Sequence, residues 1–194
     1  MYDTIQAFHL GQWGRRPGCA RRAAWRNAVR MARSYWEYWI STLGETDADE
    51  AKQLRDQFAS LGAPNPEDWA GSEIREGIAQ LARFLVLRRL WQGAMDGWRD
   101  RSEVEAVPAA KRLLDSGADF DDVSRAMRVA AFEAAFGVLE VIDEGYDPQA
   151  ADGLPMWSLR EMRDDVLTGR PIGGLHESFQ SLDPSGTDGA DLWD

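Results

Sequence analysis

The sequence is poor in the residues that bind metals or form disulfides. Its 194 residues include one cysteine, Cys19, and two histidines, His9 and His176. A single cysteine cannot form an intramolecular disulfide, and these three residues cannot supply a CxxC pair or a Cys/His zinc spacing. We therefore expect no metal, no cofactor and no disulfide, which suits a reducing cytoplasm.

Long hydrophobic runs are also missing. The longest apolar stretch covers residues 78–91 and contains three arginines, whereas a membrane-spanning helix needs about 20 apolar residues. Four arginines lie within residues 15–22, where the apolar part of a signal peptide would be. We expect a soluble, cytoplasmic protein that does not contact a membrane.

Lysine is scarce, because Lys52 and Lys111 are the only lysines among 22 basic residues. The excess of arginine is typical of a high-GC coding bias and indicates a bacterial source. Acidic residues outnumber basic ones, and the net charge is −11. This charge disfavours nucleic-acid binding, because phosphate binding needs a positive surface.

Motifs of the common enzyme classes are absent. The sequence contains no GxSxG, no glycine-rich phosphate loop with lysine, no HExxH and no calcium-binding loop. We therefore predict no catalytic residue, and the sequence favours a protein without enzymatic activity over an enzyme.

Helical periodicity dominates the first 168 residues. Apolar residues recur at intervals of three and four, and capping residues, glycine or proline stand at the ends of the periodic segments. No segment alternates as a half-buried strand does. We predict an all-α fold, a compact bundle of about six helices. The expected helices cover residues 20–43, 48–61, 72–98, 102–114, 119–141 and 158–168. Gly62 ends the second of them, and capping boxes start the fourth at Ser102 with Glu105 and the sixth at Ser158 with Glu161. Pro108 is an alternative first turn of the fourth helix.

Two of these helices are expected to be central. The segment 72–98 is apolar nearly all round in its middle, which is typical of a helix covered on several sides. The helix that begins at Asp119 carries one apolar stripe that we expect to face the core. That stripe comprises Val123, Met127, Ala130, Ala134, Val138 and Val141, and it is widened by Phe132, Phe136 and Leu139.

The last 26 residues have a different composition. They contain five glycines and two prolines, together with several acids, and such a segment buries too little apolar surface to offset the entropy of ordering it. We expect a single helical domain over residues 1–168 and a flexible acidic tail over residues 169–194.

Two glutamates define a candidate pocket. Glu133 and Glu140 are seven residues apart, which places them on one side of the predicted fifth helix. If they were buried they would need cationic partners, and Arg83 and Arg88 on the other central helix are the candidates. A structural ion-pair set is favoured over a pair of catalytic carboxylates, because the sequence offers no nucleophile or metal site.

The charge is unevenly distributed along the chain. Residues 1–43 hold seven arginines and two acids, so they carry +5 and the remainder carries −16. The first predicted helix combines an arginine ladder with aromatic residues, which are enriched at protein interfaces. The candidate partner-binding residues are Arg22, Arg26, Arg30, Tyr35, Trp36, Tyr38 and Trp39.

Three interpretations of this first helix stay open. Its arginines could pair with the acidic remainder of the same chain, bind a protein partner, or contact nucleic acid. The sequence favours these interpretations in that order. We expect a small recognition factor, of an immunity or regulatory type, that binds one protein partner through this helix or through its acidic surface. The alternatives are an enzyme or apolar-ligand pocket that uses Glu133 and Glu140, and an acidic mimic of nucleic acid. The sequence does not indicate an oligomeric state.

Overall fold

A computed structural model describes residues 35–183 and 189–193. The chain divides after Gly44 into two units. Of the first unit the described part is short: residues 35–42 are helical, and the rings of Trp36 and Trp39 lie 5.1 Å apart. The predicted helix over 20–43 therefore lies mostly outside the described residues. The second unit begins at Glu45 and contains all the elements described below.

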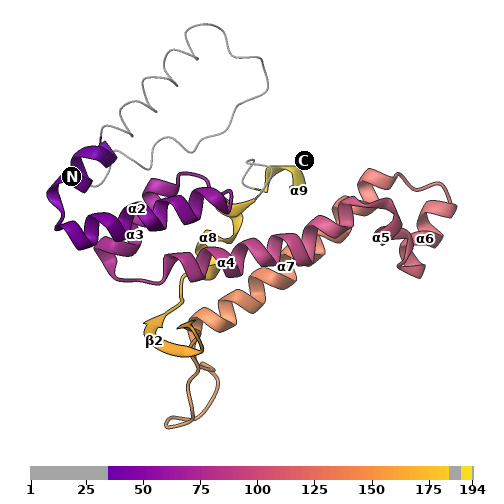
Figure 1. Cartoon of the computed structure of the whole chain (residues 1–194). Coiled ribbons are helices and arrows are strands. Elements are labelled where there is room, and N and C mark those ends of the chain that lie inside the picture. The colour runs from indigo at the N-terminus through magenta and orange to yellow at the C-terminus, as the bar shows by residue number, and fades with distance from the viewer. Residues whose placement is uncertain (1–34, 184–188, 194) are drawn as a thin grey trace, which may run out of the picture. The chain divides into compact units, whose positions relative to one another are not determined.

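The second unit is mainly helical and starts with a helix pair, α2 (Glu45–Ser60) and α3 (Pro66–Glu76) (Figure 1). The helix expected over 48–61 is confirmed as α2. It ends as predicted at Gly62, whose φ of 80° is left-handed, and glycine favours this conformation because it has no Cβ. Pro66 starts α3, since a first-turn residue needs no free N–H. The ring of Phe58 stacks on Trp69 at 5.8 Å.

The helix expected over 72–98 is interrupted in the structure. Gly77, with a φ of 66°, ends α3, and α4 (Gln80–Leu90) follows. The chain then continues as a π-helical turn over Trp91–Met95 and a 3-10 turn over Asp96–Arg99. Trp91 and Met95 are buried, so this segment does reach the core as expected.

Two short helices, α5 (Arg101–Glu105) and α6 (Pro108–Asp115), replace the single helix expected over 102–114. Asp100, rather than Ser102, caps α5 by accepting a hydrogen bond from the Ser102 amide at 2.8 Å. Proline starts α6 at Pro108. Buried Val104, from α5, packs against residues of α6 and α7 in a small separate core.

The longest helix is α7 (Phe120–Glu144), and it begins as predicted. The carboxylate of Asp119 caps it by accepting hydrogen bonds from the amides of Asp121 and Asp122 at 2.8 and 3.3 Å. Gly145, with a φ of 73°, ends it. No helix of the described residues is long and apolar enough to cross a membrane.

The predicted core face of α7 is confirmed in part, because Val123, Phe132 and Leu139 are buried. Four residues of the expected core stripe are exposed, namely Ala130, Ala134, Val138 and Val141. The buried face is centred on Phe132 and Leu139, which the sequence placed at the edge of the expected stripe. Apolar residues occupy two faces of this helix, and the face with the larger side chains removes more apolar area from water when it is buried.

A two-stranded antiparallel hairpin follows, formed by β1 (Arg160–Arg163) and β2 (Val166–Pro171), with Met162 opposite Leu167. The helix expected over 158–168, and the expectation of no sheet, are therefore wrong. That helix was expected because Ser158 and Glu161 have the spacing of a capping box, but Glu161 instead binds Thr168 and Arg170 on the opposite strand of the hairpin. The turn residues Asp164 and Asp165 both have a positive φ, as a two-residue hairpin turn of type I′ requires.

The expected flexible tail is also wrong for the described residues. The segment contains α8 (Leu175–Phe179), a 3-10 turn over Gln180–Leu182, and α9 (Ala190–Trp193). Leu175 and Phe179 are completely buried. Phe179 stacks on Phe132 at 5.2 Å, and its carbonyl accepts a hydrogen bond from Nε1 of Trp91 at 2.8 Å. A few well-spaced apolar residues thus anchor a segment that is rich in glycine.

An ion pair anchors α9 as well. Asp191 Oδ2 lies 2.8 Å from the guanidinium of buried Arg128 and 3.0 Å from that of Arg99. Burial alone would raise the pKa of Asp191, but the hydrogen bonds and charges of the two arginines outweigh burial and lower that pKa. The carboxylate is therefore held in its charged form.

We predict that Phe179→Ala lowers the free energy of unfolding by about 3–5 kcal/mol, because it leaves a cavity beside Phe132 and Trp91. Met156→Ala, at an exposed position, serves as the control and changes this free energy by less than about 0.5 kcal/mol. Urea denaturation measures both. Equal stability of the two variants would mean that residues 175–182 contribute no core contacts.

Candidate interaction surface

The β1–β2 hairpin has its polar and apolar faces reversed relative to a usual half-buried sheet. Glu161 points inward and is 4% exposed, whereas Met162 and Leu167 on the opposite face are 56% and 61% exposed. Antiparallel sheets with one solvated face normally turn the apolar face inward. We call the surface formed by Met162 and Leu167 the outer hairpin face.

A buried cluster of ions holds the inner face against α3. The guanidinium of Arg170 lies 2.7 Å from Oε1 of Glu161 and 2.9 Å from Oε1 of Glu73, and both glutamates are buried. Glu73 Oε2 also accepts a hydrogen bond from the Leu81 amide at 2.8 Å. Arg163 adds longer contacts of 3.2 Å to Glu161 and 3.5 Å to Glu73. The cluster connects α3, β1 and β2.

These contacts fix the charge of the cluster. Burial alone would raise the pKa of Glu161, but hydrogen bonds from Arg170 and Thr168 and the charges of Arg170 and Arg163 outweigh burial and hold this pKa below its ordinary value. Burial alone would lower the pKa of Arg170, and its two carboxylate partners reverse that direction. Both carboxylates are occupied by partners, so the geometry suits a structural role rather than acid–base chemistry.

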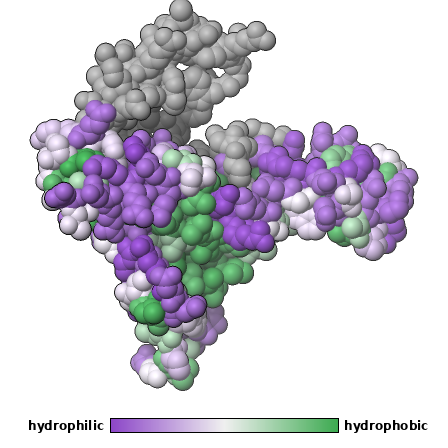
Figure 2. Space-filling model, in the orientation of Figure 1, coloured by the Kyte–Doolittle hydropathy of each residue, from purple (hydrophilic) through white to green (hydrophobic). Residues whose placement is uncertain are grey.

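Exposed hydrophobic residues concentrate around the hairpin. Of the fifteen large hydrophobic side chains that are exposed among the described residues, ten come from residues 138–167. Nε1 of Trp157 donates a hydrogen bond to the Val141 carbonyl at 2.8 Å, which ties the loop before the hairpin to the end of α7. Figure 2 shows a hydrophobic area over the part of the molecule where Figure 1 places α4 and α7. The ten residues are Val138, Val141, Tyr146, Leu154, Met156, Trp157, Leu159, Met162, Val166 and Leu167.

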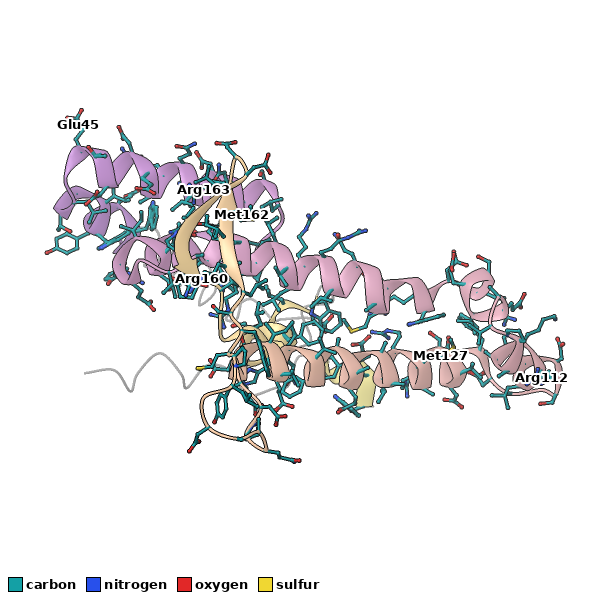
Figure 3. All side chains as sticks on the ribbon, turned by 90° about the horizontal axis from the view of Figure 1, so that it is seen from below. Glu45, Arg112, Met127, Arg160, Met162 and Arg163 are labelled. Atoms are coloured by element: carbon teal, nitrogen blue, oxygen red, sulfur yellow. The ribbon has the colours of Figure 1, made fainter. Side chains whose placement is uncertain are left out.

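An open hollow of about 630 Å³ lies between α2 and the hairpin. Arg163 contributes the hairpin side, and Figure 3 shows Arg163 and Met162 next to each other on the strand. All other lining residues belong to α2, and three of them are acidic. The α2 residues are Glu45, Thr46, Asp49, Glu50, Gln53, Leu54 and Gln57. We call this depression the α2 hollow.

The candidate pocket residues are not brought together as a cluster. Glu133 and Glu140 lie on the exposed side of α7, and no ion pair of the described residues joins either of them to Arg83 or Arg88. Arg88 is half-buried on α4.

Arg83 contacts the C-terminal segment instead. Its guanidinium donates hydrogen bonds to the Gly174 carbonyl and to Oγ of Ser178, the latter at 2.6 Å. Burial lowers the pKa of Arg83, although nearby acids such as Glu177 and Asp143 oppose the shift. This arginine therefore docks α8 on α4.

A histidine–aspartate pair, not predicted from the sequence, joins α7 to α8. Nδ1 of His176 lies 2.7 Å from Oδ2 of Asp143, which also accepts the His176 backbone N–H at 3.0 Å. The His176 ring packs edge-on against Phe136 at 5.8 Å. Ser178, the closest hydroxyl in sequence, is hydrogen-bonded by Arg83. The arrangement resembles a docking contact more than a nucleophile and its base.

The candidate partner-binding residues of the first predicted helix differ in their exposure to solvent. Tyr35 and Tyr38 are exposed, Trp36 is buried and Trp39 is half-buried. The predicted ladder of Arg22, Arg26 and Arg30 lies outside the described residues.

Neither a metal-binding cluster nor a similar protein of known function indicates what this surface does. Within residues 35–183 and 189–193, no group of three or more histidine, cysteine or acidic side chains is placed to hold a metal ion. Comparison of the chain with protein-family models, with characterised proteins and with solved structures finds no match. The interpretation of the surface therefore depends on its geometry.

We predict that Arg170→Leu lowers the free energy of unfolding by about 3 kcal/mol, because it leaves Glu73 and Glu161 buried with too little compensating charge. Arg55→Leu removes an arginine from an exposed pair with Asp56 and costs less than about 1 kcal/mol. Chemical denaturation at neutral pH measures both variants. Equal losses would show that the cluster does not hold the hairpin.

The lowered pKa of Glu161 also predicts a pH dependence. Its stabilising contribution is complete above the ordinary glutamate pKa of 4.5 and is lost as the pH falls through the lower pKa of the folded state. Unfolding measured from pH 7 to pH 3 should therefore show wild type losing its advantage over Glu161→Gln in the acidic range. Glu133→Gln, at an exposed position, is the control and should follow wild type throughout. A constant difference between wild type and Glu161→Gln would contradict this prediction.

Proposed function

We propose that this protein is a protein-recognition module that binds its partner through the outer hairpin face. The observation that carries the proposal is the reversed hairpin, which buries ions and exposes Met162 and Leu167. Exposed apolar side chains of this kind, placed next to each other on paired strands, are typical of surfaces that another protein covers. Methionine also adapts its shape to a partner at low cost.

The rigidity of the hairpin supports this function. The contacts of Arg170 with α3 and the hydrogen bond from Trp157 to α7 hold the segment at both of its ends. A surface that is ordered before binding loses less conformational entropy when the partner arrives. The hairpin is therefore suited to specific recognition as well as to hydrophobic contact.

The other functions considered from the sequence have less support. An enzymatic or apolar-ligand pocket around Glu133 and Glu140 would need carboxylates that converge in a concavity, and both side chains are exposed on α7. Binding through the first helix is supported by exposed Tyr35 and Tyr38, while buried Trp36 is unsuited to direct contact. An immunity or regulatory role stays a prediction.

The test uses the double variant Met162→Ser/Leu167→Ser and a matched control, Leu85→Ser/Leu113→Ser, which changes two exposed leucines elsewhere. Both variants should unfold within about 1 kcal/mol of wild type, because surface substitutions change stability little. Tagged forms are cross-linked in the native host, and the captured protein is quantified by mass spectrometry and then titrated against each purified form.

We expect wild type and the control to retain the same partner, and the hairpin variant to bind it at least about tenfold more weakly, since the loss of two buried apolar contacts costs more than 1.4 kcal/mol. Equal affinity of the hairpin variant and the control would contradict recognition through this face.

A further inference from the structure

The backbone of β1 leaves hydrogen-bonding groups unpaired on its outer edge. In an antiparallel pair, residues that exchange backbone hydrogen bonds with the partner strand alternate with residues whose N–H and C=O point away from it. Arg163 and Val166 flank the two-residue turn and form a bonded pair, so Met162 directs its N–H and C=O away from β2. The extra residues of the bulge lie on β2, so the alternation continues along β1 to Arg160.

The other contacts of β1 agree with this assignment. Among the described residues, no hydrogen bond from outside the hairpin reaches the N–H or C=O of Arg160 or Met162. The carbonyl of Leu159 accepts the Ile172 amide at 2.9 Å, as the alternation requires. Within the part of the chain that the structure describes, β1 packs extensively along β2 and along no helix. The outer edge of β1 is therefore an open strand edge.

The outer edge of β2 is closed by comparison. Pro171 has no N–H, and proline on an edge strand prevents further pairing. Gly169 has a left-handed φ of 83°, and its carbonyl accepts a hydrogen bond from Nη1 of Arg160 at 2.7 Å. On this strand Leu167 alone keeps both backbone groups directed outward. Of the two edges, β1 is the one on which another strand can pair.

From this asymmetry we infer that the partner binds as an extended strand that pairs with the edge of β1. Its backbone exchanges hydrogen bonds with Arg160 and Met162. The side chain that it places opposite Met162 lies on the outer hairpin face and is apolar. In such strand addition, backbone hydrogen bonds supply affinity and side-chain contacts supply specificity. The inference rests on the proposed function and adds the conformation of the partner to it.

The probe is a capped, fluorescent eight-residue peptide in which valine and threonine alternate, because both residues favour strands. A control peptide has the same side chains and carries N-methyl groups on all its amides, so it cannot donate backbone hydrogen bonds. Each peptide is titrated by fluorescence anisotropy. The key variant is Met162→Pro, and its matched control is Leu167→Pro. Proline removes an outward N–H at either position without removing a hydrogen bond of the hairpin.

We expect wild type and Leu167→Pro to bind the unmodified peptide equally. Met162→Pro should bind it at least about tenfold more weakly, because the edge of β1 loses a backbone donor and the proline ring obstructs an added strand. The N-methylated peptide should bind wild type at least about tenfold more weakly than the unmodified peptide does.

Amide hydrogen exchange tests the same edge without any substitution. In wild type alone, the amides of Arg160 and Met162 should exchange faster than those of Glu161 and Arg163, which are bonded to β2. The unmodified peptide should slow exchange at Arg160 and Met162 and leave Leu167 unchanged. This measurement decides the question even if Met162→Pro does not fold.

Several results would overturn the inference. They are no binding of the unmodified peptide, equal weakening by the two proline variants, and slowed exchange at Leu167 in place of Arg160 and Met162. Slowed exchange at Arg160 and Met162 on raising the protein concentration alone would assign the edge to a second copy of the chain instead. In each case, loss of the natural partner from Met162→Ser/Leu167→Ser would still support recognition through the outer hairpin face, so the two proposals fail separately.

Discussion

The contact of Arg170 with two buried carboxylates determines how the hairpin is oriented. A buried ion cluster adds little net stability, because desolvation of the charges offsets their attraction. The hydrogen-bonded ion pairs of such a cluster form, however, only when the side chains point toward one another. Because side chains alternate along a strand, turning Glu161 inward turns Met162 outward, and a slip of one residue would reverse both. The pairing register shifts between Arg160 and Met162, on either side of Glu161.

The same type of contact positions the C-terminal part of the chain. Arg83 binds α8, Arg128 and Arg99 bind α9, and Arg170 binds α3. Arg83, Arg99 and Arg170 each reach more than one acceptor, which a lysine ammonium does less well. The excess of arginine seen in the sequence thus has a structural use, whatever its origin in codon bias. Stacking of Phe179 on Phe132 supplies the apolar part of the same docking.

The sequence predicted local features well and long-range ones poorly. The cap at Asp119 and the end of α2 at Gly62 depend on neighbouring residues, and both were confirmed. The hairpin was missed because polar residues stand on both faces of its strands, so no apolar–polar alternation marks them. The contact of Glu73 with Arg170 joins residues 97 positions apart, and no spacing rule predicts it. On α7 both faces are apolar, and only the packing of Phe132 and Leu139 decided which one is buried.

The acidic surface and the apolar face have complementary effects in the proposed function. An exposed apolar hairpin favours self-association, but two copies that each carry −11 repel one another at long range. The same field attracts a cationic partner and raises its association rate, while the apolar contact mainly sets how slowly it dissociates. A protein with this charge can therefore expose an apolar face and still discriminate against a second copy of itself.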